Sequence, residues 1–190
     1  MTDGSSVTID LTAPTLSSVS IASNSSVLSS LAKAGDVITV SIQATQEDIR
    51  AVVVLIGGHA ADVTQVTVGD LRSYTARYTV VSTTADGEAA VVIDFEDMAG
   101  NAGAKQTSTT DASKVIVDTT APTLAALTMV SSNAANSSLA IVGDTITVTI
   151  TASEAIGTPS VTIAGQAASV QGSGTAVSYT HLTLPTTPYV

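Results

Sequence analysis

The chain has 190 residues and a formal net charge of −10, with no Cys, no Trp and only 12% charged residues. Its six Lys and Arg residues are scattered, which argues against nucleic-acid binding, and the lack of Cys excludes disulfides and thiolate metal sites. No apolar run approaches the roughly 20 residues that a membrane-spanning helix needs. The polar start Met1–Gly4 is unlike a signal peptide, so for a secreted protein we expect the true N-terminus to be missing.

One stretch occurs twice, as Asp10–Leu16 (DLTAPTL) and Asp118–Leu124 (DTTAPTL). Each copy follows a β-like run and precedes an alternating one. Its proline fixes φ and holds the preceding Ala extended, so the stretch predicts a short, stiff joint. The same offset of 108 residues relates Gly35 to Gly143, and such a long ungapped match indicates an internal duplication.

The repeat predicts how the chain is organised. Residues 1–12 match the end of a repeat and are expected to form the last strand of a preceding one, plus its joint. Residues 13–120 form one complete module, and residues 121–176 form the N-terminal half of a second. After a slip of one residue, Val54–Val63 matches Val161–Val170.

Short strands separated by turns are predicted throughout the complete module. Ile38, Val40 and Ile42 alternate with polar residues, and Ile93 and Phe95 share one face of a later run, so these side chains are expected in the core. Seven strands at this spacing are typical of an antiparallel β-sandwich. The predicted strands are Leu16–Ile21, Val37–Ala44, Ala51–Ile56, Ala61–Val68, Tyr74–Val81, Ala89–Phe95 and Lys114–Val117, with Ala85–Gly87 as a tight turn.

As a set, five features resemble the bacterial immunoglobulin-like repeats of large surface proteins. They are the joint DTTAPT, the strand GDxITV, the Glu before the third strand, YTARYTV at Tyr74–Val80 and DMAGN at Asp97–Asn101. The resemblance covers essentially all of residues 3–176. It implies tandem immunoglobulin-like sandwiches, the second incomplete, in an extracellular adhesin, biofilm protein or enzyme stalk.

The C-terminal segment breaks the repeat. Residues 177–190 begin Val-Ser-Tyr-Thr-His-Leu-Thr-Leu-Pro-Thr, which resembles a translated sequencing-library adapter. We therefore expect a non-native tail, and a second module that lacks the strands needed to bury Ile146, Val148 and Ile150. Residues 121–190 are expected to leave an apolar face open.

Catalysis has little support. His59 follows a Gly-Gly turn, and its repeat partner is Gln166, whereas a catalytic base would be expected in both copies. His181 lies in the doubtful tail. With Ser and Thr so abundant, a chance Ser/His/Asp grouping carries no weight. The chain is therefore predicted not to be an enzyme and to need no organic cofactor.

Calcium is the one site hypothesis that the residues raise. In an immunoglobulin-like sandwich two loops would lie at the pole where the chain enters, and they carry Glu47, Asp48, Asp97 and Asn101, while the entering joint carries Asp10. Such hard oxygen ligands suit Ca²⁺, and similar repeats hold the ion at their joints. The matching residues of the second copy are Asp118 and Glu154. The alternative is that Asp97 and Asn101 merely cap a turn.

Two functions follow from the resemblance. The first is a structural spacer of a bacterial cell-surface or secreted adhesin. Its partners would be neighbouring repeats, and other domains would contact a host or matrix surface. The alternative is an accessory module of a secreted polysaccharide-acting enzyme. Few aromatic side chains are available to stack on a sugar, because the complete module has only Tyr74, Tyr78 and Phe95.

Overall fold

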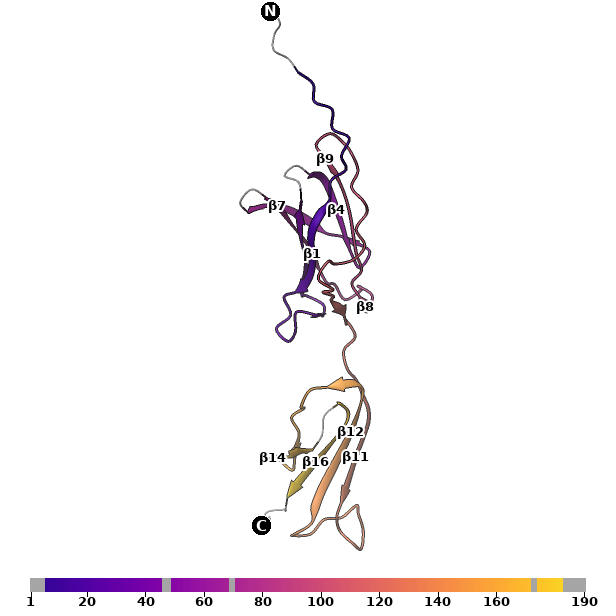
Figure 1. Cartoon of the computed structure of the whole chain (residues 1–190). Coiled ribbons are helices and arrows are strands. Elements are labelled where there is room, and N and C mark those ends of the chain that lie inside the picture. The colour runs from indigo at the N-terminus through magenta and orange to yellow at the C-terminus, as the bar shows by residue number, and fades with distance from the viewer. Residues whose placement is uncertain (1–5, 46–48, 69–70, 172–173, 183–190) are drawn as a thin grey trace, which may run out of the picture. The chain divides into compact units, whose positions relative to one another are not determined.

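The computed structural model describes residues 6–45, 49–68, 71–171 and 174–182, and the strands are the only regular elements in this part of the chain. The predicted all-β class is therefore confirmed. Contacts divide the chain into two compact units, residues 1–120 and 121–190 (Figure 1).

The first unit contains three sheets. A four-stranded antiparallel sheet has the order β1-β3-β7-β6, and a three-stranded antiparallel sheet has the order β5-β4-β9. In a third, smaller sheet, β10 pairs parallel with β2 and antiparallel with β8. The strands are β1 Leu16–Ser23, β2 Leu31–Ala32, β3 Val37–Ala44, β4 Ile49–Ile56, β5 His59–Ala60, β6 Asp62–Val68, β7 Leu71–Thr79, β8 Gly87–Glu88, β9 Val91–Asp97 and β10 Ile116–Val117.

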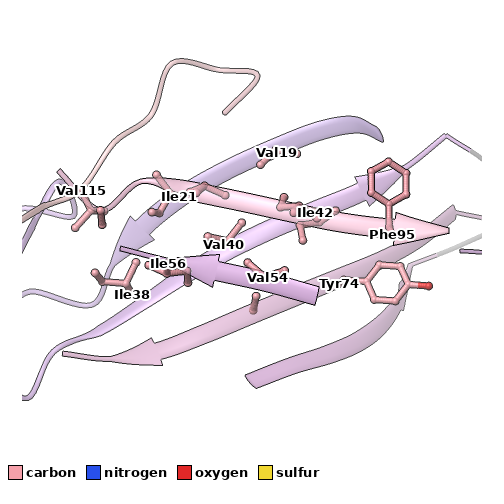
Figure 2. Close-up of a cluster of buried hydrophobic side chains, with 14 of the residues drawn as sticks. Val19, Ile21, Ile38, Val40, Ile42, Val54, Ile56, Tyr74, Phe95 and Val115 are labelled. Carbon is pink, nitrogen blue, oxygen red and sulfur yellow. The ribbon is translucent and has the colours of Figure 1, made fainter. Parts of the chain in front are cut away.

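Buried side chains from these sheets form one apolar cluster. In β3 the alternating residues Ile38, Val40 and Ile42 are buried, as are Ile93 and Phe95 in β9, so the predicted core residues are confirmed. Figure 2 shows aliphatic side chains of β1, β3, β4 and Val115 meeting in this cluster, with the rings of Tyr74 and Phe95 at one end. The core is thus mostly aliphatic, as the composition predicts.

One turn lies earlier than predicted. The chain reverses at Val81–Thr84, where the Thr84 amide donates to the Val81 carbonyl oxygen at 2.9 Å. Gly87, which was assigned to the turn, instead begins β8. The difference arises because the Thr84 hydroxyl also accepts from the Val81 amide at 3.0 Å, which favours the earlier turn.

Hydroxyl side chains cover the outer edge of β1. The amide of Val19 donates to Thr110 Oγ1 at 2.9 Å, and the amide of Ile21 donates to Ser113 Oγ at 2.9 Å. Thr110 donates its own amide to the Val19 carbonyl at 2.8 Å. The segment before β10 thereby satisfies an edge that would otherwise be open to pairing with another strand.

The second unit repeats the start of the first. Its four-stranded sheet has the order β11-β12-β16-β15, and β13 and β14 form a separate hairpin. Leu124 pairs with Ala152 and Leu127 with Ile150, and a bulge follows Leu124, which is the β1–β3 register shifted by 108 residues. The strands are β11 Leu124–Ser131, β12 Thr145–Ile156, β13 Thr162–Ile163, β14 Gln166–Ala167, β15 Ser169–Gln171 and β16 Gly174–Leu182.

Burial in the second unit is sparse but not absent. The exposed large apolar residues include Leu124, Leu127 and Met129, which confirms the expectation of an open face. The expectation was too severe for Val148 and Ile150, because these two side chains are buried with Ile163. The hairpin that carries Ile163 supplies this cover.

The segment that breaks the sequence repeat begins inside a strand. β16 pairs with β12 in the place that β7 takes beside β3, with Val148 opposite Tyr179. In the first unit the residue opposite Val40 is Ala76. Tyr179 therefore takes the place of Ala76, which is an offset of 103 residues and not the 108 of the repeat. Strand pairing thus extends into residues 177–182. Residues 183–190 lie outside the described part of the chain. The origin of residues 177–190 in a sequencing-library adapter stays a prediction.

Candidate functional site

The loop that follows β9 is organised around the carboxylate of Asp97. Oδ1 of Asp97 accepts from the amides of Gly100 at 2.7 Å and Asn101 at 2.8 Å. Its Oδ2 accepts from the side-chain amide of Asn101 at 2.9 Å. Asp97 is buried, and the Asn101 side-chain hydrogen bond is the main cause that lowers its pKa, while burial opposes the shift. The charged carboxylate therefore holds this turn closed.

The same loop contacts the chain as it enters the first unit. Asn101 Nδ2 donates to the backbone carbonyl oxygen of Asp10 at 3.1 Å. The Asp10 carboxylate itself accepts from the Thr12 amide at 2.9 Å. Asp10, Asp97 and Asn101 are thus brought together, although it is the carbonyl of Asp10 that faces Asn101.

A basic group also lies beside this loop. The guanidinium of Arg50 pairs with Glu96 at 3.0 Å, and a Cβ built on Gly100 would lie 3.5 Å from an Arg50 nitrogen. A cation at this place would raise the free energy of a divalent ion nearby. Both carboxylate oxygens of Asp97 already accept hydrogen bonds, so a Ca²⁺ ion would have to compete with these donors for its oxygen ligands.

The other predicted ligands lie elsewhere. Glu47, with its neighbour Asp48, falls outside the described residues. Asp118 follows β10 and accepts from the Thr120 amide at 3.1 Å, which is the Asp10–Thr12 turn repeated. Glu154 lies in β12 of the second unit with a buried carboxylate oxygen that has no hydrogen-bond partner. Within the described ranges, no three Asp, Glu or His side chains form a group able to hold a metal ion.

Asp86 is a joint residue that the sequence did not reveal. Its Oδ1 accepts from the amide of Thr119 at 2.6 Å and from Thr119 Oγ1 at 2.9 Å, and its Oδ2 accepts from Thr120 Oγ1 at 2.7 Å. These bonds, the one from Thr120 first, lower the pKa of Asp86. They tie the exit of the first unit to a loop 33 residues upstream, and no local pattern marks such a contact.

The aromatic residues divide into buried and partly exposed ones. Tyr74 and Phe95 are buried, and the Tyr74 hydroxyl donates to the Ile49 carbonyl oxygen at 2.8 Å. Tyr78 is partly exposed and stacks on the ring of exposed His59, with ring centroids 4.8 Å apart. In the second unit, Gln166 occupies the hairpin place of His59, as the sequence match predicts.

Comparison with protein-family models, curated proteins and solved structures found no match to this chain. Among the residues described, no helix is long and apolar enough to cross a membrane. A functional interpretation must therefore come from the repeat and from the contacts at its joints.

Proposed function

We propose that the chain is a non-catalytic spacer, built from tandem immunoglobulin-like β-sandwiches, in a bacterial cell-surface or secreted adhesin-like protein. Its partners would be neighbouring repeats of the same chain, and other domains would contact a host or matrix surface. The repeat of strand register, bulge and joint turn between the two units supports a modular array. An aliphatic core with a hydroxyl-rich exterior suits a part whose task is mechanical.

The observation that carries this proposal is the set of hydrogen bonds from Thr119 and Thr120, at the joint, to Asp86. A spacer keeps the domains at its two ends apart only if the joints between its repeats resist bending. Three hydrogen bonds to the Asp86 carboxylate restrain Thr119 and Thr120 at such a joint. The Pro that follows, Pro122, removes further freedom. At the entrance, Asn101 holds the carbonyl of Asp10 in a comparable way.

Calcium would add to this stiffness. The ion would bind where Asp10, Asp97 and Asn101 meet, with Glu47 completing the set. Ca²⁺ would have to displace amide donors from Asp97, so we expect weak binding, in the 10⁻⁴–10⁻³ M range of extracellular modules.

The second candidate is an accessory module of a secreted polysaccharide-acting enzyme. The His59–Tyr78 stack favours it, because an aromatic face near solvent can pack on a sugar ring. Burial of Tyr74 and Phe95 leaves Tyr78 as the remaining candidate of the three aromatic residues that the sequence offered. Loss of polysaccharide binding on Tyr78→Ala, with folding intact, would favour this reading.

The spacer proposal is tested by measuring whether the two units tumble together. Amide ¹⁵N relaxation should give both units one correlation time in the wild type, with or without millimolar Ca²⁺. Asp86→Ala should separate the two correlation times, whereas Asp94→Ala, which removes an exposed pair with Lys105, should not. Independent tumbling in the wild type at every Ca²⁺ concentration would show that the joint is not stiff, and the spacer reading would be wrong.

A further inference from the structure

The loop that carries Asp86 is held in place by Thr84, a residue that is only 5% exposed. The Thr84 hydroxyl accepts from the Val81 amide at 3.0 Å, and the Thr84 amide donates to the Val81 carbonyl oxygen at 2.9 Å. The Thr84 carbonyl oxygen accepts from Thr119 Oγ1, in the joint, at 3.2 Å. Thr84 thus closes the turn after β7 and also contacts the joint. The Asp86 carboxylate, two residues further on, can hold the joint only while this turn stays in position.

The Thr119 side chain lies between two acceptors of this loop. Its Oγ1 is 2.9 Å from Asp86 Oδ1 and 3.2 Å from the Thr84 carbonyl oxygen. A hydroxyl donates a single proton, so these two contacts share it. The Thr119 amide, in contrast, donates its own proton to Asp86 Oδ1 at 2.6 Å. The bond from this amide is therefore the contact that reports most directly how well the loop presents Asp86 to the joint.

The Thr84 hydroxyl is linked in turn to a pair of aromatic rings. The Tyr78 hydroxyl, on β7, lies 2.8 Å from Thr84 Oγ1. The Tyr78 ring stacks on His59 of the β4–β5 hairpin, with the ring centroids 4.8 Å apart and the planes inclined by 6°. A tyrosine whose ring is held by stacking aims its hydroxyl in a fixed direction. Because His59 is exposed and Thr84 is buried, the contacts run from the surface of the first unit to the loop of Asp86.

We propose that the His59–Tyr78 stack sets the stiffness of the joint, by fixing Thr84 and with it the loop that presents Asp86. His59 and Tyr78 are positioning residues, because they act on the joint through Thr84. Without the Tyr78 hydroxyl, the turn keeps its backbone bond but loses its side-chain link to β7, and the bond from the joint to Asp86 opens more often. The inference rests on the spacer proposal for the importance of stiffness, although every contact it uses lies in the first unit.

The first test measures amide hydrogen exchange at the joint in the full chain. In Tyr78→Phe the hydroxyl contact with Thr84 is lost, and we expect the Thr119 amide to exchange about threefold to tenfold faster, the range of one net hydrogen bond. The Asp118 amide is the internal reference, because it donates to the Ala32 carbonyl oxygen and not to the loop of Asp86. The quantity to compare is the ratio of the Thr119 rate to the Asp118 rate, since general destabilisation raises both.

The matched control removes another tyrosine hydroxyl from the same strand. Tyr74 donates to the Ile49 carbonyl oxygen at 2.8 Å, so Tyr74→Phe should leave the exchange ratio unchanged. An unchanged ratio in Tyr78→Phe, or an equal rise in Tyr74→Phe, would overturn the proposal. Independent tumbling of the two units would instead contradict the spacer proposal and leave the exchange result intact, so the two failures are distinguishable.

The second test traces the effect from His59 to Asp86. His59→Ala removes the ring that packs on Tyr78 and should raise the exchange ratio, whereas His59→Phe keeps an aromatic face and should restore it. In an Asp86→Ala background neither Tyr78→Phe nor His59→Ala should raise the ratio further, because the acceptor of the Thr119 amide is gone. A ratio that does not respond to His59→Ala, or that rises equally in the Asp86→Ala background, would overturn the proposal.

Discussion

The two units share a strand pattern but not a core. Val19 is fully buried in β1, whereas Leu127, its repeat equivalent in β11, is 64% exposed, and Ile21 and Met129 differ in the same way. The backbone register of the two strand pairs is the same. What differs is the cover, because β9, β10 and Val115 contribute to the core of the first unit, and the described part of the second has no equivalents of them. The register between neighbouring strands is thus set by the two strands themselves, while the burial of their side chains depends on segments from elsewhere in the chain.

The outer edges of the two equivalent strands, β1 and β11, also differ in how well they are covered. Thr110 and Ser113 satisfy the outer edge of β1, and no such hydroxyl segment accompanies β11 in the described residues. The open face of the second unit forms an apolar hollow of about 760 Å³, lined by Leu127, Met129 and Ile150 among others. Exposed apolar surface beside an open edge favours association.

The largest difference between the units should come from a buried charge. Val40 and Val148 are repeat equivalents, but Val148 borders the open hollow. Val40→Asp should unfold the first unit, because an unpaired buried carboxylate costs several kcal/mol. Val148→Asp should cost much less, since water can reach the carboxylate through the hollow. Urea unfolding of the full chain, followed by the NMR signals of each unit, measures both. Equal losses would mean that the second unit is as closed as the first.

A smaller effect is expected where a glycine makes room for an aromatic ring. A Cβ on Gly103 would overlap the ring of Phe95, whereas Gly157 in the second unit faces open space. Gly103→Ala should destabilise the first unit by about 1–3 kcal/mol, as overpacking does, and Gly157→Ala should change stability by less than about 0.5 kcal/mol. The cost of Gly103→Ala should shrink in a Phe95→Leu background. If Phe95→Leu leaves the cost unchanged, the ring is not its cause.

Acid should weaken the first unit through Asp97. Its folded-state pKa lies below the ordinary aspartate value of 3.8, so the stabilisation is complete above that pH and is lost as the pH falls through the lower, folded-state pKa. Asp97→Asn should therefore lower stability at pH 7 and flatten the acid dependence of unfolding. Exposed Asp94→Asn is the control. An unchanged acid slope in Asp97→Asn would show that Asp97 does not titrate with unfolding.

The sequence predicted what depends on neighbours in the chain. Alternation placed Ile38, Val40 and Ile42 inward, and the offset of 108 predicted that β11 and β12 would repeat β1 and β3. The β16 strand was not foreseen, because residues 177–182 do not follow the repeat and pair with β12 through backbone groups that most sequences can supply. The cover that Ile163 gives to Val148 was missed because it depends on how the β13–β14 hairpin packs against β12, which no local sequence pattern indicates.

The candidate site was predictable only in part. The sequence placed Asp97, Asn101 and Asp10 at one end of the first unit, and the structure brings them together. It could not distinguish a turn cap from metal ligands, because the same oxygens serve both uses. Asp86 escaped notice since its three donors lie on Thr119 and Thr120, 33 and 34 residues away.

The smallest expected effect compares one turn in the two units. The hairpins β4–β5 and β13–β14 reverse through Gly57-Gly58 and Ala164-Gly165 in the same conformation, with φ of 57° at Gly57 and 50° at Ala164. A side chain in this left-handed region costs about 1–2 kcal/mol, and glycine avoids that cost.

Exchanging the two residues should therefore have opposite signs. Gly57→Ala should destabilise the first unit by about 1 kcal/mol, because the new Cβ meets no clash beyond the backbone strain, its nearest neighbour being Ala89 at 4.0 Å. Ala164→Gly should stabilise the second unit by somewhat less than about 1 kcal/mol. Glycine relieves the backbone strain, but it also raises the conformational entropy of the unfolded chain, which offsets part of the gain. Thermal unfolding of each unit, followed by its own NMR signals, measures both changes. If both substitutions shifted stability in the same direction, the two hairpins would not share the turn, and the one-residue slip that aligns Val54–Val63 with Val161–Val170 would have to be abandoned.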